Sequence, residues 1–313
     1  MVGVDALAGL LDGPRARGAF VLRTVFSPPW AIRLEDESPL TVVAVVRGAV
    51  WVAGDGGPWT RLDAGDVGIA RGPRHYTMAD DPATTPTVVV KPGQQCYPIG
   101  VPDAYPIDLG VRTWGTDPQG SISTICGTYE QAGAISQRLL DALPPLFTLS
   151  AADLDSPLVG LLATEVGRDH LGQEAVLDRL LDLLLITVLR AWFDRAGAAP
   201  AWYAAHRDPL AGAALRLLHD EPARPWTVAS LAAAVGVSRA ALARRFTDTV
   251  GEPPMSYLTS WRLALAADLL REPDATVTEV ARRVGYASPY ALSTAFKRVR
   301  GVSPREHRAM SPA

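Results

Sequence analysis

Two short stretches near the carboxyl end of the chain carry side chains suited to reading the edges of nucleic-acid bases. Arg244 in the first stretch can donate two hydrogen bonds to one guanine, and serine or threonine hydroxyls can bond to several bases. A lysine such as Lys297 can neutralise a phosphate. We therefore predict sequence-specific binding to double-stranded DNA, with Arg244 as the main base contact. The predicted contacts are Ser238, Arg239, Ala240, Ala243, Arg244 and Thr247 in the first stretch and Ser288, Tyr290, Ser293, Thr294 and Lys297 in the second.

Both stretches belong to one motif that the chain contains twice. The second copy follows the first by 49 residues up to a turn glycine and by 50 residues beyond it, so the second turn is one residue longer. Repetition of polar, apolar and turn residues in the same order indicates two structural units of one kind. The paired positions are Thr227 and Thr276, Gly236 and Gly285, Ser238 and Ser288, Phe246 and Phe296, Gly251 and Gly301, and Pro254 and Pro304.

Each copy is expected to fold as a helix, a tight turn and a second helix. Thr276 and Glu279 have the capping-box spacing that fixes the start of a helix. A glycine can end that helix in the left-handed conformation, and Ser288 followed by Pro289 can cap and start the next one. In both second helices a leucine and a phenylalanine four residues apart pack inward. The opposite face stays free, and in a helix-turn-helix that face enters the DNA major groove.

A single copy would fit a simple hairpin of two helices as well as it fits a DNA-binding motif. The presence of two copies favours DNA binding, because residues 254–270 form a connector between them. This connector has about 17 residues, with Leu258, Trp261, Leu265 and Leu269 at helical spacing, and as a helix it would span roughly 25 Å. It could hold two recognition helices about one DNA turn, ~34 Å, apart.

Residues 208 to about 308 resemble the DNA-binding domain of AraC/XylS-type bacterial transcription regulators. The resemblance covers both copies, the connector with Tyr257, Arg262 and Ala266-Ala267, and the signature formed by Gly285-Tyr286, Phe296, Gly301 and Pro304. It implies a regulator that works as a homodimer with RNA polymerase as a further partner. Ala240 departs from the pattern, since many members carry a larger base-contacting side chain there. Base readout by the first copy should therefore depend mainly on Arg244.

Composition is compatible with two domains, since 313 residues with 48% apolar content can form two cores. The net charge of −3 conceals an asymmetry: residues 210–313 have 14 basic and 9 acidic side chains, and residues 1–209 have 16 basic and 24 acidic ones. This distribution fits nucleic-acid binding by the carboxyl half, although solvated charges would explain it equally well. No signal peptide or membrane-spanning run is apparent. We expect a cytoplasmic protein without a membrane partner.

The part of the chain from about residue 18 to residue 130 has the pattern of strands and turns. Its segment from Gly65 to His75 resembles the second motif of cupins, and the run Cys126-Gly127-Thr128-Tyr129 fits the cupin domains that are fused to some AraC-type regulators. The resemblance implies a small jelly roll whose interior can hold a small-molecule effector. The expected fold class is therefore α+β, with a β-rich amino half and an all-α carboxyl half.

Cupin enzymes usually need several metal ligands, and His75 is the only histidine between residues 18 and 130. A lone histidine is more often a hydrogen-bonded structural residue, so we expect no catalytic residue, cofactor or enzyme activity. A cupin metalloenzyme with a DNA-binding tail is one alternative, but it lacks a histidine cluster. A DNA-alkylation repair sensor is another, but its zinc site needs four cysteines and this chain has two.

Cys96 and Cys126 both lie in the expected sensor domain. The simplest interpretation is that they are small buried apolar residues. A second interpretation is a reversible disulfide that senses an oxidant, and a third is a soft metal ion held by both thiols and His75. These three interpretations remain open from the sequence.

Residues 131–195 have a helical pattern, with the main helix from Glu174 to Phe193. Its apolar face could cover the barrel or form a dimer contact, and the sequence favours neither. Residues 196–207 are expected to be a linker, which gives a sensor domain over 1–195 and a DNA-binding domain over 208–313. The residues assigned to the apolar face are Val176, Leu177, Leu180, Leu181, Leu184, Val188 and Leu189.

Overall fold

The computed structural model describes residues 19–100, 106–129, 137–195, 197–271 and 274–309. The chain divides into two compact units. Residues 15–135 and 139–194 belong to the first unit, and residues 195–313 belong to the second. Among the helices of the described residues, none combines the length and apolar character that a membrane-spanning segment requires.

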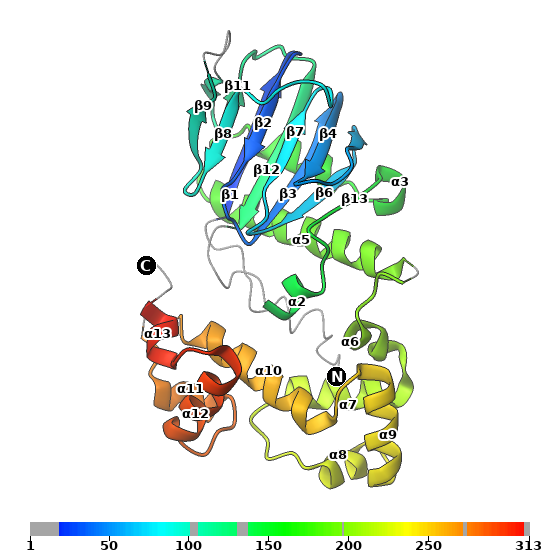
Figure 1. Ribbon diagram of the computed structural model, residues 1–313. Coiled ribbons are helices and arrows are strands. Elements are labelled where there is room, and N and C mark those ends of the chain that lie inside the picture. Colours follow the sequence, from blue (N-terminus) through cyan, green and yellow to red (C-terminus); the bar gives the residue numbers. More distant parts are fainter. Residues whose placement is uncertain (1–18, 101–105, 130–136, 196, 272–273, 310–313) are drawn as a thin grey trace. The chain divides into compact units, whose positions relative to one another are not determined.

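The first unit is a pair of β-sheets, which confirms the α+β fold class and the cupin-like jelly roll (Figure 1). The strands are β1 Phe20–Phe26, β2 Ala31–Leu34, β3 Leu40–Arg47, β4 Ala49–Gly54, β5 Thr60–Asp63, β6 Val67–Arg71, β7 Tyr76–Ala79, β8 Val88–Lys91, β9 Gln95–Pro98, β10 Ile107–Gly110, β11 Thr113–Gly115, β12 Ile122–Tyr129 and β13 Leu146–Leu149. One sheet has the order β10-β11-β1-β12-β3-β6-β13, and the other has the order β5-β4-β7-β2-β8-β9.

The core of this unit lies between the two sheets. Apolar residues from both sheets form one buried cluster, in which Phe26 stacks on Trp30 with ring centroids 4.6 Å apart. The long antiparallel pair β3 and β12 forms the centre of one wall, with Val43 opposite Cys126. Strand β13 was not predicted, because the residues after 131 have a helical pattern. This short strand pairs with β6, with Phe147 opposite Ile69, and its alternating burial is too brief to stand out in the sequence.

The main helix of this unit packs on the sheet that contains β12. It is α5 Gln173–Asp194, which follows α2 Gln137–Asp141, α3 Ala151–Leu154 and α4 Leu158–Glu165. A Cβ atom at Gly127 of β12 would lie 2.3 Å from Cδ1 of Leu181, so a side chain at Gly127 would prevent this close approach.

The predicted apolar face of α5 is divided between two sides of the helix. Leu181 and Leu184 are buried, so this face covers the barrel. Val176 was assigned to the same face, but it is 43% exposed, and Leu183 is 51% exposed. The apolar surface of α5 therefore runs around more of the helix than one stripe, which is why the sequence could not show which side faces the sheet.

The second unit consists of helices, and it begins earlier than predicted. Its helices are α6 Ala201–Ala204, the 3-10 helix η1 Ala205–Arg207, α7 Pro209–Asp220, α8 Val228–Ala234, α9 Arg239–Val250, α10 Pro254–Leu269, α11 Val277–Arg283, α12 Pro289–Arg300 and α13 Pro304–Ala309. Helices α6 and η1 occupy the second half of the predicted linker 196–207. Trp202 and Ala205 are buried, and α6 and η1 contact α9. The linker prediction is wrong for residues 201–207, because Trp202 anchors this segment in an apolar core.

Both predicted helix-turn-helix units are present. The Thr227 hydroxyl accepts a hydrogen bond from the Ser230 backbone N–H at 3.0 Å, and the Thr227 N–H donates to the Ser230 hydroxyl at 2.9 Å. The full capping box thus forms in the first copy, while in the second Thr276 accepts from the Glu279 N–H at 3.1 Å. The turn glycines Gly236 and Gly285 have φ values of 74° and 80°, in the left-handed region as predicted.

Helix α10 connects the two helix-turn-helix copies and is buried on more than one side. Its first half contributes Tyr257 and Trp261 to the core of the first copy, where the Tyr257 ring lies edge-on to Phe246 at 5.8 Å. Its second half contributes Leu263 and Ala267 to the core of the second copy, around α11 and α12. Leu265 and Leu269, which are at helical spacing with Trp261, are only partly buried. The buried side changes along the helix because two different cores use it.

A loop between α7 and α8 also joins the two copies. The Arg262 guanidinium of α10 donates to the carbonyl oxygens of Pro222 and Arg224, both at 2.7 Å. A Cβ atom at Gly285 would lie 2.6 Å from the Cα of Ala223. The second turn therefore rests on the loop that precedes the first helix-turn-helix, whereas Gly236 has no heavy atom within 4 Å of such a Cβ position.

We predict that Gly285→Ala destabilises the protein more than Gly236→Ala does. Both substitutions place a side chain on a left-handed residue, which costs about 1 to 2 kcal/mol. At Gly285 alone the new Cβ meets backbone atoms, and such overpacking adds roughly 1 to 3 kcal/mol. Chemical denaturation followed by tryptophan fluorescence measures both free energies of unfolding. Equal losses for the two variants would contradict the packing of the second turn against Ala223.

Candidate nucleic-acid interface and barrel cavity

Helix α9 presents the predicted contact residues of the first copy on one face. Arg239, Ala240 and Arg244 are exposed, and Ala243 and Thr247 are partly buried. Leu242 and Phe246 are completely buried on the opposite side, so the helix has the two faces that the four-residue spacing predicts. Ser238 caps the helix, since its hydroxyl accepts from the Ala241 N–H at 3.2 Å.

Two neighbouring arginines of α9 have different environments. Arg245 donates from Nε to the Asp208 carboxylate at 2.8 Å, and Asp208 caps α7 through the N–H groups of Leu210 and Ala211. The Ala211 N–H and the Arg245 guanidinium together keep the pKa of Asp208 below its usual value. Arg244 forms no hydrogen bond or ion pair with any residue in the described ranges. Its guanidinium is therefore available for a ligand, while Arg245 serves the packing of α7 on α9.

Helix α12 presents the contact residues of the second copy. Tyr290 is 81% exposed, and Thr294 and Lys297 are also exposed. Ser288 caps the helix by accepting from the Ala291 N–H at 3.1 Å. The Ser293 hydroxyl donates to the Pro289 carbonyl oxygen at 2.8 Å, so its oxygen is left to accept a bond from a DNA base or from water. The spacing of residues could not reveal this local bond.

Several basic side chains of the second copy were not among the predicted contacts. Arg282, Arg298 and Arg305 are exposed, and they add positive charge beside Lys297. The excess of basic residues after residue 210 indicated that such side chains exist. A net charge, however, does not show which arginines face the solvent. Arg308 has a structural role, because its guanidinium donates to the carbonyl oxygens of Leu270, at 3.0 Å, and Ala275.

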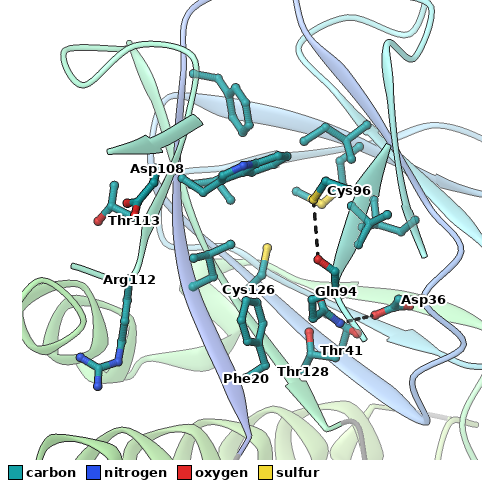
Figure 2. Close-up of a pocket in the computed structure, with 18 of the residues that line it drawn as sticks. Phe20, Asp36, Thr41, Gln94, Cys96, Asp108, Arg112, Thr113, Cys126 and Thr128 are labelled. Atoms are coloured by element: carbon teal, nitrogen blue, oxygen red, sulfur yellow. Dashed lines mark hydrogen bonds between the residues drawn. The ribbon is translucent and has the colours of Figure 1, made fainter. Parts of the chain in front are cut away.

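A cavity of about 320 Å³ lies between the two sheets of the first unit. Its wall is mostly aromatic and aliphatic, with a few polar groups, and Figure 2 shows several of these side chains directed into it. The cavity is of the size and character of a small-molecule site. It contains no histidine among its lining residues.

Both cysteines line this cavity, Cys96 from β9 and Cys126 from β12 (Figure 2). The structure thus brings the two predicted thiols to one place, and they form no disulfide with each other. Burial raises the pKa of Cys126 to about 11 and also raises that of Cys96. Both groups are therefore protonated near neutral pH, and a protonated thiol is a poor nucleophile. Their environment fits apolar packing better than oxidant sensing.

His75 lies with charged groups and does not line the cavity that contains the thiols. Its Nδ1 is 3.9 Å from carboxylate oxygens of both Glu35 and Asp55. Glu35 also pairs with Lys91, whose hydrogen bond lowers the pKa of that carboxyl group. No group of three or more His, Cys, Asp or Glu side chains in the described ranges could hold a metal ion. The structure does not assemble the hypothetical metal site of His75, Cys96 and Cys126.

Comparisons with known proteins agree with this architecture. Residues 5–194 match the cupin family, and residues 231–310 match a family of helix-turn-helix domains. A putative AraC-like transcription regulator of Streptomyces lividans is 35% identical over 97% of this chain and 98% of its own length. The HTH-type transcriptional regulator AlkR of Acinetobacter baylyi is 29% identical over 98% of this chain and all of its own length.

A solved structure also matches about a third of the chain. The DNA-binding domain of AdpA, solved in complex with a target DNA, is 37% identical and covers 33% of this chain and 91% of its own, with a TM-score of 0.31. The full-length relatives and the cupin match together establish the family. The chain belongs to the AraC-like transcription regulators, with a cupin domain ahead of a helix-turn-helix DNA-binding domain.

Proposed function

We propose that this regulator reads its operator with α9 and α12 in adjacent major grooves of one DNA face. The observation that supports this most directly is the pair of capped helices with free outer faces, both packed on α10. A helix shared by two cores fixes the distance between the two recognition helices. DNA with matching groove spacing can then be bound without rearrangement of the unit.

The exposed residues divide into two roles in this proposal. Arg244 has no partner among the described residues and can bond to two acceptors of a guanine. Lys297 and Arg283 are exposed basic side chains that would contact phosphates. Arg244 of α9 thus provides the main base contact, while Lys297 of α12 and Arg283 of α11 add affinity for any DNA.

The outer side of α5 is proposed as the homodimer contact. Val176, Leu180, Leu183, Thr187 and Arg190 follow one another at intervals of four and three residues, which is the spacing of a two-helix seam. Val176 and Leu183 are large apolar residues exposed to solvent. Dimerisation would bury them and would link two DNA-binding units, which raises avidity without any new base contact.

We also propose an effector, a cellular location and a further protein partner for this regulator. The barrel cavity would bind a small-molecule effector, whose presence changes operator binding. The regulator would act in the cytoplasm with RNA polymerase as a partner. The family to which the chain belongs supports these assignments.

For the recognition helix α9, we predict that Arg244→Ala weakens operator binding by ~1 to 3 kcal/mol and relaxes the sequence preference at one base pair. Lys297→Ala should weaken binding to all sequences. It should also reduce the slope of log affinity against log salt concentration by about one. Arg245→Ala is the matched control, since its guanidinium holds Asp208, and it should leave base preference unchanged. Binding to a library of operator variants at several salt concentrations measures these effects. A uniform loss from Arg244→Ala across all sequences would remove Arg244 from the base contacts.

For the dimer contact, we predict that Leu183→Asp gives a folded monomer, because a charge on an exposed contact face prevents association without entering the core. The neighbouring Leu184 is the matched control: it is 1% exposed, against 51% for Leu183, so Leu184→Asp should unfold the barrel. Sedimentation velocity reports the oligomeric state, and thermal unfolding reports the fold. A Leu183→Asp variant that remains a dimer would place the contact elsewhere.

A further inference from the structure

The barrel cavity has a wall of aromatic rings. Phe26 stacks on Trp30 at 4.6 Å and meets Trp114 edge to face at 5.7 Å. Phe20 and Tyr76 also line the cavity. Aromatic faces carry partial negative charge and attract cations, most strongly where water is excluded. The wall can therefore bind apolar groups and positive charge together.

A carboxylate completes this wall at one end. Asp36 lines the cavity and accepts hydrogen bonds from the Ser38 hydroxyl at 2.8 Å and from the Gln94 amide at 3.1 Å (Figure 2). It forms no ion pair with any residue in the described part of the chain. Burial is the main cause of the raised pKa values of Tyr76 and Cys126, and the charge of Asp36 raises both further. The negative charge of Asp36 therefore acts inside the cavity.

The other two charged lining residues do not balance Asp36. Asp108 is exposed, and Arg112 donates to the Arg168 carbonyl oxygen at 3.4 Å. In Figure 2 both side chains lie on the side away from Asp36, and the Arg112 guanidinium points away from the cavity. The interior thus combines aromatic rings with one uncompensated carboxylate.

We propose that the effector of this cavity is an organic cation, either a quaternary ammonium ion or a protonated hydrophobic amine, with its positive centre facing Asp36 and its apolar groups on the rings of Trp30 and Trp114. Carboxylate ligands are disfavoured because their charge repels Asp36. At about 320 Å³ the cavity suits a compact ligand rather than a long chain. The role of this cation as an effector rests on the proposed function. Its binding to the cavity can be measured separately, without DNA.

The test uses three matched probes: benzyltrimethylammonium, its neutral carbon isostere neopentylbenzene, and phenylacetate. Calorimetry and quenching of tryptophan fluorescence measure their binding to the full chain. The cation should bind at least about tenfold more tightly than the neutral isostere, and phenylacetate should not compete. Asp36→Asn should abolish this preference, while Asp108→Asn should keep it.

A second variant keeps the test decisive if Asp36→Asn fails to fold by thermal unfolding. Trp114→Leu retains an apolar side chain but removes an aromatic face. It should therefore lower the affinity for the cation several-fold and lower the affinity for the neutral isostere less. Equal affinities for cation and isostere, or no binding of any probe, would overturn the proposal. Cation binding that leaves operator affinity unchanged would instead count against effector control in the proposed function, and the ligand class would stand.

Discussion

The burial of α10 in two cores is the constraint on which the DNA-binding unit depends. An ordinary surface helix has one apolar stripe, but α10 contributes Tyr257 and Trp261 to one core and Leu263 and Ala267 to the other. The helix cannot rotate or shift without exposing apolar surface on one side, and the burial of a leucine such as Leu263 contributes about 1.5 to 3 kcal/mol. The positions of α9 and α12 relative to one another follow from this packing.

Further contacts make the unit stiffer around this helix. The buried His219 ring nitrogen Nε2 lies 2.7 Å from the Tyr257 hydroxyl, which joins α7 to α10. Arg262 holds the loop after α7, and Gly285 allows the second turn to rest on it. At the other end, His307 of α13 is hydrogen-bonded to the Ala267 carbonyl oxygen at 3.2 Å, and burial lowers the pKa of this histidine. These bonds connect distant segments to α10, so both recognition helices are held by one framework.

Much of the second unit could be predicted because local chemistry determines it. Threonine and serine caps, left-handed glycines and leucine–phenylalanine pairs act within a few residues, and the repetition of the motif showed that they were not accidental. Features that depend on distant contacts could not be predicted. The segment 201–207 looked like a linker until the burial of Trp202 showed otherwise, and nothing local distinguishes Leu183 from Leu184. The cavity beside Asp36 likewise arises only when β1, β9 and β12 come together.

In the proposed function, one protomer reads two adjacent major grooves from a fixed framework. Methylation interference at guanine N7, on an operator selected from random DNA, tests this most directly because N7 lies in the major groove. We predict that each protomer gives two clusters of interfering guanines, about 10 to 10.5 base pairs apart on one face of the duplex. A single cluster per protomer, or two clusters on opposite faces, would contradict this arrangement of α9 and α12.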